Sequence, residues 1–124
     1  MAFADPAVIT INGTGYSLVR INQDGYSSEY RLRSTTDEYR LLIRNTSYMD
    51  KKRTVSIDRH NVDFTHTVFA VAPSTIDKVR HIYVVLENQQ GDTLTDPVLE
   101  AIGVLSFLTA SSGANLAKLL NSES

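Results

Sequence analysis

The sequence contains no cysteine and no tryptophan, and only three of its 124 residues are proline. The lack of cysteine excludes disulfides, thiolate metal sites, iron–sulfur clusters and cysteine nucleophiles. Since a small secreted chain often relies on disulfides, it also favours assembly in a reducing cytoplasm. The first residues, Met1 to Pro6, have neither the basic nor the long apolar region of a signal peptide. We therefore expect a soluble protein made in the cytoplasm.

Long apolar runs are missing as well. The longest, Val98 to Ala110, contains Glu100 and is too short to cross a bilayer, so we expect no membrane partner. Apolar residues make up 42% of the chain and charged residues 21%, which is the composition of an ordinary folded protein. A length of 124 residues fits one domain.

The charge is unevenly distributed. The formal net charge is −2, yet residues 31–59 hold eight of the twelve basic residues and four of the fourteen acidic ones. That segment therefore carries +4, and the rest of the chain carries −6. The plain interpretation is a solvated hairpin with basic side chains. The alternative is a basic surface that meets phosphate.

The first ninety residues have the alternating apolar pattern of strands, and the last thirty have helical spacing. A shift in apolar parity at Arg59-His60-Asn61 predicts a β-bulge or bend. Asp96-Pro97 predicts a helix start with Asp96 as its cap, and Ser111-Ser112-Gly113 predicts its end. The expected strands cover 7–12, 16–21, 29–33, 38–46, 53–58, 62–70 and 78–88, and the expected helices cover 96–110 and 114–120.

A sheet with one apolar face and a helix that is apolar almost all round need a partner to cover them, because the chain is too short to do so itself. The simplest partner is another copy. We therefore predict an obligate homodimer in which the helices pack over the sheet of the other subunit. The predicted dimer interface consists of Ile102, Leu105, Leu108 and Leu116.

The other face of the sheet is expected to stay open. Arginines spaced two apart on a strand project to one side and can follow a phosphate backbone. Hydroxyl groups can reach base edges or ribose, and a tyrosine can stack on an unpaired base. The residues placed on this face by parity are Arg40, Arg44, Thr46, Thr54, Ser56 and Tyr83.

Catalysis and metal binding have little support. His60 and His66 are six residues apart on a predicted strand and match no zinc pattern. Ser56, Asp58 and His60 contain the residue types of a catalytic triad, but no nucleophile elbow or oxyanion loop accompanies them. We expect no enzyme, no catalytic residues, no metal site and no cofactor. A structural divalent ion at a subunit interface stays open, since acidic loop residues such as Asp24, Glu87 and Asp92 are available.

The sequence also resembles the coat proteins of the small single-stranded RNA bacteriophages, the levivirus type. The likeness runs from about Leu18 to Leu120. The residues that carry it are Ile21-Asn22-Gln23-Asp24-Gly25-Tyr26, Ser28-Glu29-Tyr30, Arg59-His60-Asn61-Val62, Phe64-Thr65, Thr67-Val68, Ala70, Val79-Arg80, Tyr83-Val84-Val85 and Leu105-Ser106-Phe107.

The resemblance implies an α+β fold: an N-terminal β-hairpin, a five-stranded antiparallel sheet, two C-terminal helices and an interlocked homodimer. It implies one coat-protein domain over 1–124, with the hairpin at 1–22, the sheet at 27–91 and the dimerising helices at 96–121. Dimers are expected to close an icosahedral shell, T=3 in form, around a single-stranded RNA genome. The protein would be assembled in the bacterial host cytoplasm and located in the virion.

The resemblance further implies that the inward sheet face binds an RNA hairpin at the replicase start and represses translation. The implied RNA-binding residues are Arg40, Arg44, Thr46, Lys52, Thr54, Ser56, Tyr83 and Glu87, with Leu42, Asp58 and Val85 at neighbouring inward positions. The implied loop between dimers contains Ala72, Pro73, Ser74 and Thr75. The alternative function is a cellular dimeric RNA-binding regulator on a similar scaffold.

Overall fold

The computed structural model describes residues 2–124, which form two compact units. The first ends at Glu87 and holds almost all of the sheet, and the second runs from Asn88 to Ser124 and holds the helix. Each unit is described by itself.

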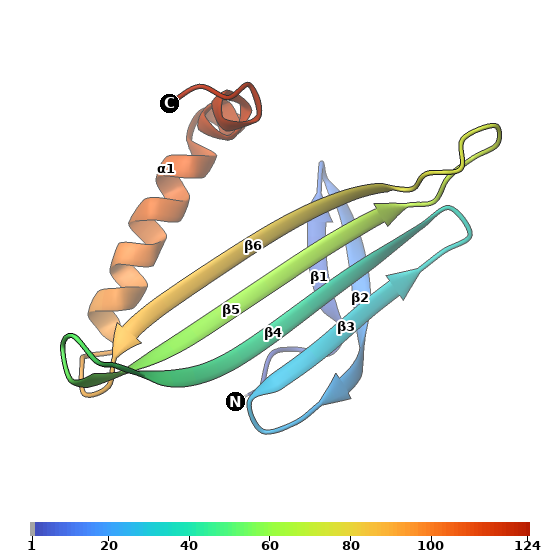
Figure 1. The fold of residues 1–124 in the computed structure, drawn as a ribbon. Coiled ribbons are helices and arrows are strands. Elements are labelled where there is room, and N and C mark those ends of the chain that lie inside the picture. Colours follow the sequence, from blue (N-terminus) through green and yellow to red (C-terminus); the bar gives the residue numbers. More distant parts are fainter. Residues whose placement is uncertain (1) are drawn as a thin grey trace. The chain divides into compact units, whose positions relative to one another are not determined.

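The sheet contains six strands in the order of the chain, each next to its predecessor (Figure 1). The register is antiparallel from β1 to β5, and the cross-strand side-chain pairs of β5 and β6 also run in opposite directions. The prediction of an N-terminal hairpin followed by an antiparallel sheet is confirmed. The sheet has four strands beyond the hairpin instead of five, because the strands expected at 53–58 and 62–70 are one strand. The strands are β1 (Ala7–Ile11), β2 (Thr14–Gln23), β3 (Ser27–Arg33), β4 (Asp37–Asp50), β5 (Val55–Val68) and β6 (Lys78–Gln89).

The β1–β2 hairpin turns at two residues, Asn12 and Gly13, between the paired Ile11 and Thr14. Both turn residues have positive φ, 50° and 81°. This is the conformation that an Asn-Gly pair favours in a two-residue hairpin, and it matches the twist of the strands. The turn therefore lies one residue earlier than the Gly13-Thr14-Gly15 turn expected from the sequence.

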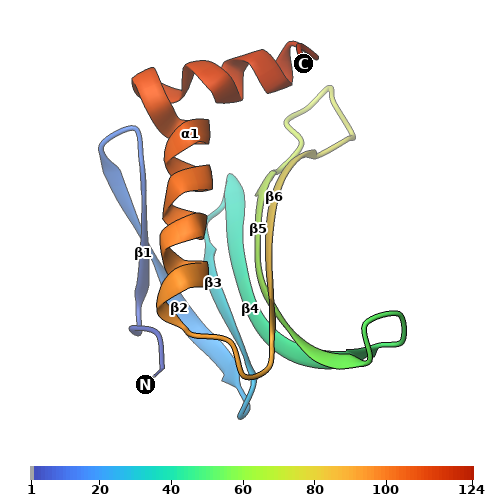
Figure 2. The ribbon, with the colours of Figure 1, turned by 90° about the vertical axis from the view of Figure 1, so that its left-hand side faces the viewer.

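The core forms where the β1–β2 hairpin folds over one face of β3 and β4 (Figure 2). Leu18 of β2 and Tyr30 of β3 are fully buried, and Leu41 and Ile43 of β4 pack against them. Tyr39 lies beside Tyr16, with ring centroids 4.7 Å apart. Burial and the hydrogen bond with Tyr16 raise the pKa of Tyr39 to about 12. The first unit thus has an apolar centre of its own, on what we call the core face.

The bulge predicted at Arg59-His60-Asn61 is wrong. β5 pairs with β4 without interruption, from Asp37 opposite Val68 to Asp50 opposite Val55. The shift in apolar parity has a different cause, because the buried side of the strand changes along its length. Phe64 packs on the core face, whereas Ile57, only 2% exposed, points to the opposite side. The bend of β4 and β5 along their length accompanies this change (Figure 2).

The second unit contains α1 (Thr95–Leu120), which is interrupted by four non-helical residues, Ala110 to Gly113. The predicted break at Ser111-Ser112-Gly113 is confirmed, and the two expected helices are the two halves of α1. The predicted cap is wrong: Leu94 occupies the N-cap position without a side-chain hydrogen bond. The Asp96 carboxylate instead accepts a 2.9 Å hydrogen bond from the Thr93 hydroxyl, because the N-cap lies two residues earlier than expected.

By length and composition α1 is apolar enough to cross a membrane. Its break decides against a continuous span, because the regular part from Thr95 to Thr109 contains 15 residues. At 1.5 Å per residue this is about 22 Å, against a hydrocarbon core of about 30 Å. No residue of α1 is buried, so its apolar side chains need a different cover.

Candidate nucleic-acid interface

The sheet face opposite the core face is polar, and the strand register determines its members. Directly paired residues project to the same side of a sheet, and alternate residues of one strand do so too. Arg40 is paired with Arg31 and Thr65, and Arg44 with Asn61. We call this surface the polar face. It contains Glu29, Arg31, Arg33, Glu38, Arg40, Leu42, Arg44, Thr46, Tyr48, Arg59, Asn61, Asp63, Thr65, Thr67, His81, Tyr83, Val85 and Glu87.

Ion pairs join the strands of the polar face. Arg40 on β4 forms a salt bridge with Glu29 on β3. Arg44 places Nη2 3.1 Å from Oδ2 of Asp63 on β5. Both arginines predicted to contact RNA therefore already have a carboxylate partner on a neighbouring strand.

Two short hydrogen bonds attach β6 to β5. Asn61 donates from Nδ2 to the Tyr83 hydroxyl at 2.5 Å, and His81 Nε2 lies 2.6 Å from Oδ1 of Asp63. Asp63 thus contacts both Arg44 and His81. The rings of His81 and Tyr83 are 5.9 Å apart. The aromatic group predicted to stack on a base is held in place by its neighbours.

A third contact lies toward the other end of the face. The Tyr48 hydroxyl donates a 2.7 Å hydrogen bond to Oε2 of Glu87, across β5. This bond raises the pKa of Tyr48 above its ordinary value of 10. Arg59 lies 3.9 Å from Oε1 of the same carboxylate. Glu87 therefore joins β4, β5 and β6 through its two oxygens.

The polar face carries much less net charge than residues 31–59 suggest. Five arginines are offset by four carboxylates (Glu29, Glu38, Asp63 and Glu87), which leaves +1 with His81 neutral. Three of these four carboxylates, Glu29, Asp63 and Glu87, lie outside the basic segment 31–59. Phosphate would meet a surface of paired arginines instead of a uniformly positive field.

The structure brings together five of the eight predicted RNA-binding residues: Arg40, Arg44, Thr46, Tyr83 and Glu87 share the polar face. Ser56 does not belong with them, because it pairs with Met49 and both project to the core face side. Asp58, opposite Ser47, is on that side as well. The predicted placement of Ser56 and Asp58 beside Arg40 is wrong, since the even-numbered residues of β4 face the odd-numbered residues of β5.

Lys52 and Thr54 lie in the turn between β4 and β5 instead of on the sheet. Asp50 shapes this turn by accepting hydrogen bonds from the Lys52 amide and the Arg53 side chain, 2.9 and 2.8 Å long. The Arg53 side chain and these amide bonds hold the pKa of Asp50 below its ordinary value. Thr54 closes the turn with a φ of 54°. Lys52 is exposed there, on a basic tip with Lys51.

Two polar atoms on the polar face are buried and lack a hydrogen-bond partner among residues 2–124. They are Nε of Arg44, a donor, and Oδ1 of Asn61, an acceptor. The two residues are directly opposite each other in the register. A group that both accepts and donates, such as a hydroxyl or a base edge, is the kind of partner that these atoms lack.

Sequence reasoning missed Glu29, Tyr48, Asn61, Asp63 and His81, all of which belong to the network on the polar face. The assumed bulge concealed the β5 residues, because it reversed the parity of one half of the strand. A count of the alternation across an unbroken β5 would have placed Asn61 and Asp63 on the face opposite to that of Val62 and Phe64.

The other two histidines have local partners within the sheet unit. His60 Nδ1 lies 2.7 Å from Oδ1 of Asn45, and His66 Nε2 lies 3.1 Å from Oδ2 of Asp37 while its ring stacks on Tyr39. Within residues 2–124, no three His, Asp or Glu side chains gather as a metal ion would require.

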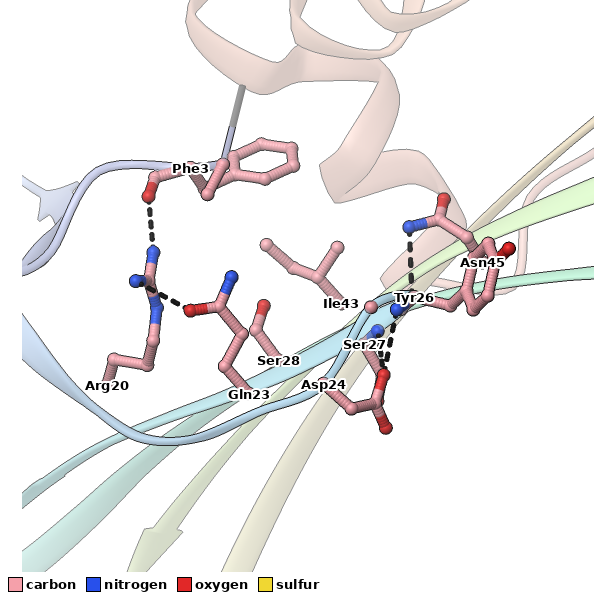
Figure 3. A pocket seen from close by; sticks show the side chains of 11 residues that line it. Phe3, Arg20, Gln23, Asp24, Tyr26, Ser27, Ser28, Ile43 and Asn45 are labelled. Carbon is pink, nitrogen blue, oxygen red and sulfur yellow. Dashed lines mark hydrogen bonds between the residues drawn. The ribbon is translucent and has the colours of Figure 1, made fainter.

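One pocket of about 340 Å³ lies on the core face side, where the N-terminal segment meets the β2–β3 turn (Figure 3). Its polar groups are used by neighbours. The Arg20 guanidinium contacts the Phe3 carbonyl and Gln23, and Asp24 accepts from the amides of Tyr26 and Ser27, which lowers its pKa. The contacts around this pocket hold the N-terminal segment at Phe3 against β2.

The remaining predicted sites are exposed, except for Leu108, which is half-buried. Ile102, Leu105, Leu108 and Leu116 lie on α1. Ala72, Pro73, Ser74 and Thr75 form the exposed connection from β5 to β6, where the Ser74 amide donates to the Val71 carbonyl at 2.8 Å.

Comparisons with known proteins give the class of the molecule. The family described as "Phage phiCb5, coat protein" matches residues 4–89. The fold is that of the bacteriophage EMS014 coat protein, with a TM-score of 0.67 at 15% identity over 98% of each chain. It is also that of the virus-like particle protein of Beihai levi-like virus 21 (TM-score 0.65, 14% identity, 99% of this chain and 98% of that one). The virus-like particle protein of Wenzhou levi-like virus 1 has a TM-score of 0.57 at 14% identity, over 94% of this chain and 96% of that one. No curated protein sequence matches.

The family model over most of the chain defines a phage coat protein, which is a structural protein and not an enzyme. The chain belongs to the phage phiCb5 coat protein family. This membership decides between the two functions that the sequence left open, in favour of the coat protein.

Proposed function

We propose that this coat protein forms homodimers that assemble into an icosahedral shell, expected to be T=3, with the polar face toward a single-stranded RNA genome. The observation that carries the dimer is the exposed apolar surface of α1, where Leu99, Ile102 and Phe107 are 60%, 56% and 64% exposed. An apolar helix without a buried residue requires a partner in water.

The core face provides a matching surface. Met49, Val62 and Ile82 lie on that side and are 58%, 38% and 59% exposed. In the proposed dimer, α1 of one copy covers this uncovered part of the other copy's sheet. Such an exchange is self-complementary, as a two-fold interface must be. Two of the structural relatives are virus-like particles, which supports assembly beyond the dimer.

The RNA contact is proposed for the polar face because Arg40, Arg44, Thr46, Asn61 and Tyr83 gather there. Guanidinium groups bind phosphate, and Tyr83 offers a ring to an unpaired base. Binding of an operator hairpin there, with repression of replicase translation, is the further step that the family resemblance implies.

The test is expression of the protein alone, with negative-stain microscopy and the ratio of absorbance at nucleic-acid and protein wavelengths. Spherical particles that contain RNA are expected. Arg40→Ala with Arg44→Ala should leave assembly intact and weaken RNA binding roughly tenfold at 0.15 M salt, because two phosphate contacts are lost.

The matched control is Lys78→Ala with Arg80→Ala. It removes the same charge from β6 side chains that project away from the polar face, Arg80 being 3.4 Å from His66. Particles of the Arg40 and Arg44 variant with the normal amount of RNA would contradict the assignment of the polar face. A clean dimer that never assembles would contradict the shell.

A further inference from the structure

The two central arginines of the polar face lie above carboxylates that are less exposed than they are. The side chains of Arg40 and Arg44 are 51% and 43% exposed, whereas their partners Glu29 and Asp63 are 18% and 14% exposed. Each carboxylate belongs to a neighbouring strand, not to a flexible loop. Each guanidinium group is therefore held by a carboxylate closer to the sheet, and part of each arginine side chain stays exposed to solvent.

This arrangement has two consequences for an anion that approaches the face. A guanidinium has five N–H donors, and a carboxylate uses one or two of them, so the others stay available in fixed directions. The carboxylate also cancels much of the positive charge that a distant phosphate would experience. The result is a geometric site for phosphate with little long-range attraction.

On the basis of the function proposed above, we propose that Glu29 and Asp63 are positioning residues that make the polar face selective for structured RNA. Held by their carboxylates, Arg40 and Arg44 engage phosphates that a folded RNA presents at their positions. A flexible single-stranded RNA loses conformational entropy when its backbone is ordered to match these positions. The weak net charge of the face offsets little of that loss.

A simpler explanation is that the two acids only lower the net charge. Glu38 separates the alternatives, because it lies on the polar face opposite Arg33 and has no ion-pair partner among residues 2–124. Glu38→Gln changes the charge of the face by one without releasing an arginine. It is the matched control for Glu29→Gln.

The experiment uses the full chain, stripped of RNA and dissociated from particles. Fluorescence anisotropy measures its binding to an oligouridine of about twenty nucleotides and to an RNA hairpin of the same length, across a salt series. Each phosphate contact to a single strand adds about 0.7 to the slope of log affinity against log salt, roughly fourfold at 0.15 M.

Glu29→Gln should bind oligouridine roughly fourfold more tightly, and Glu29→Gln with Asp63→Asn roughly tenfold, with a slope steeper by about 1.4. The preference for the hairpin should fall by a similar factor. Glu38→Gln should change the affinity about twofold or less, because it releases no arginine to make an additional phosphate contact. Since Asp63 also contacts His81, Glu29→Gln alone carries the test if the Asp63 variant does not fold.

Equal effects of Glu29→Gln and Glu38→Gln would overturn the inference, and so would unchanged or weaker oligouridine binding in the Glu29 variant. If Arg40→Ala with Arg44→Ala loses RNA binding while the acid variants behave as the wild type, the inference falls and the proposed function stands. If no variant and no wild-type protein binds either RNA, both fall together.

Discussion

The two units of this chain solve the problem of apolar surface in opposite ways. The sheet unit buries Leu18, Tyr30, Leu41 and Ile43 against one another with its own hairpin as a cover. The helical unit has no buried residue in α1, although α1 is apolar enough in length and composition to cross a membrane. A unit with its own core is stable alone, whereas a unit without one takes its stability from a partner. The same chain thus contains one region built for folding and one built for association.

The largest expected effect comes from breaking the association region. Ile102→Asp places a charge on the apolar surface of α1. The Ile102 side chain is 56% exposed in one chain and is covered in the proposed dimer. An unpaired charge in an apolar interface costs several kcal/mol. We expect complete loss of dimers and particles, measured by size-exclusion chromatography with light scattering.

The control for this prediction is Glu100→Gln, which changes the charge of the same helix by one without placing a charge on the apolar surface. It should assemble normally. Circular dichroism should show that the Ile102 variant keeps its sheet, since the core of that unit lies elsewhere. A variant that still forms particles would contradict the proposed role of α1.

The second largest effect concerns the stability of the sheet unit, which has its own core. Leu18→Ala removes a fully buried side chain from the core and should lower the free energy of unfolding by about 2 to 5 kcal/mol. Val8→Ala, on the 57% exposed Val8 of the same hairpin, should change it by less than about 0.5 kcal/mol. Urea unfolding measured by circular dichroism checks both.

The dependence on protein concentration distinguishes the two regions further. The loss caused by Leu18→Ala should be the same at low and high concentration, because the contacts lie within one chain. A loss that vanishes at high concentration would mean that the hairpin also takes its stability from the partner, and the contrast between the units would fail.

The sequence predicted the fold better than it predicted the polar face, for a physical reason. Strands such as β4 bury every second residue, and Tyr39, Leu41 and Ile43 show that alternation directly. β5 changes its buried side between Ile57 and Phe64 as it bends. Local alternation cannot distinguish such a change from an inserted residue, so Ser56 was placed on the wrong face and Asn61 was missed.

The ion pairs of the polar face could not be predicted from the sequence, for a different reason. Arg40 and Glu29 are eleven residues apart, and Arg44 and Asp63 nineteen. Their contact depends on the register between strands, which a turn or bulge shifts by whole residues. The basic segment was visible in the sequence, but the carboxylates that offset it came from strands whose register was unknown.

The smallest effect concerns the acid stability of the sheet unit. Asp37 at the start of β4 accepts a 2.7 Å hydrogen bond from the Ser34 hydroxyl and lies 3.1 Å from His66. These contacts hold its pKa below the ordinary value of 3.8. A carboxyl with a lowered folded-state pKa contributes stability that is fully present above its unfolded pKa. That contribution is lost as the pH falls through the folded value.

Unfolding measured from about pH 6 to about pH 2 should therefore show a stability that begins to fall near the ordinary Asp pKa. Asp37→Asn should be less stable than the wild type at neutral pH, with the difference shrinking below about pH 4. Ser34→Ala removes the main cause of the shift and should reproduce part of this behaviour. If the curves of the wild type and Asp37→Asn run parallel over the whole range, the β3–β4 turn contributes nothing to acid stability. The sensitivity of the sheet to acid must then come from elsewhere, for example from the Asp50–Arg53 pair in the β4–β5 turn.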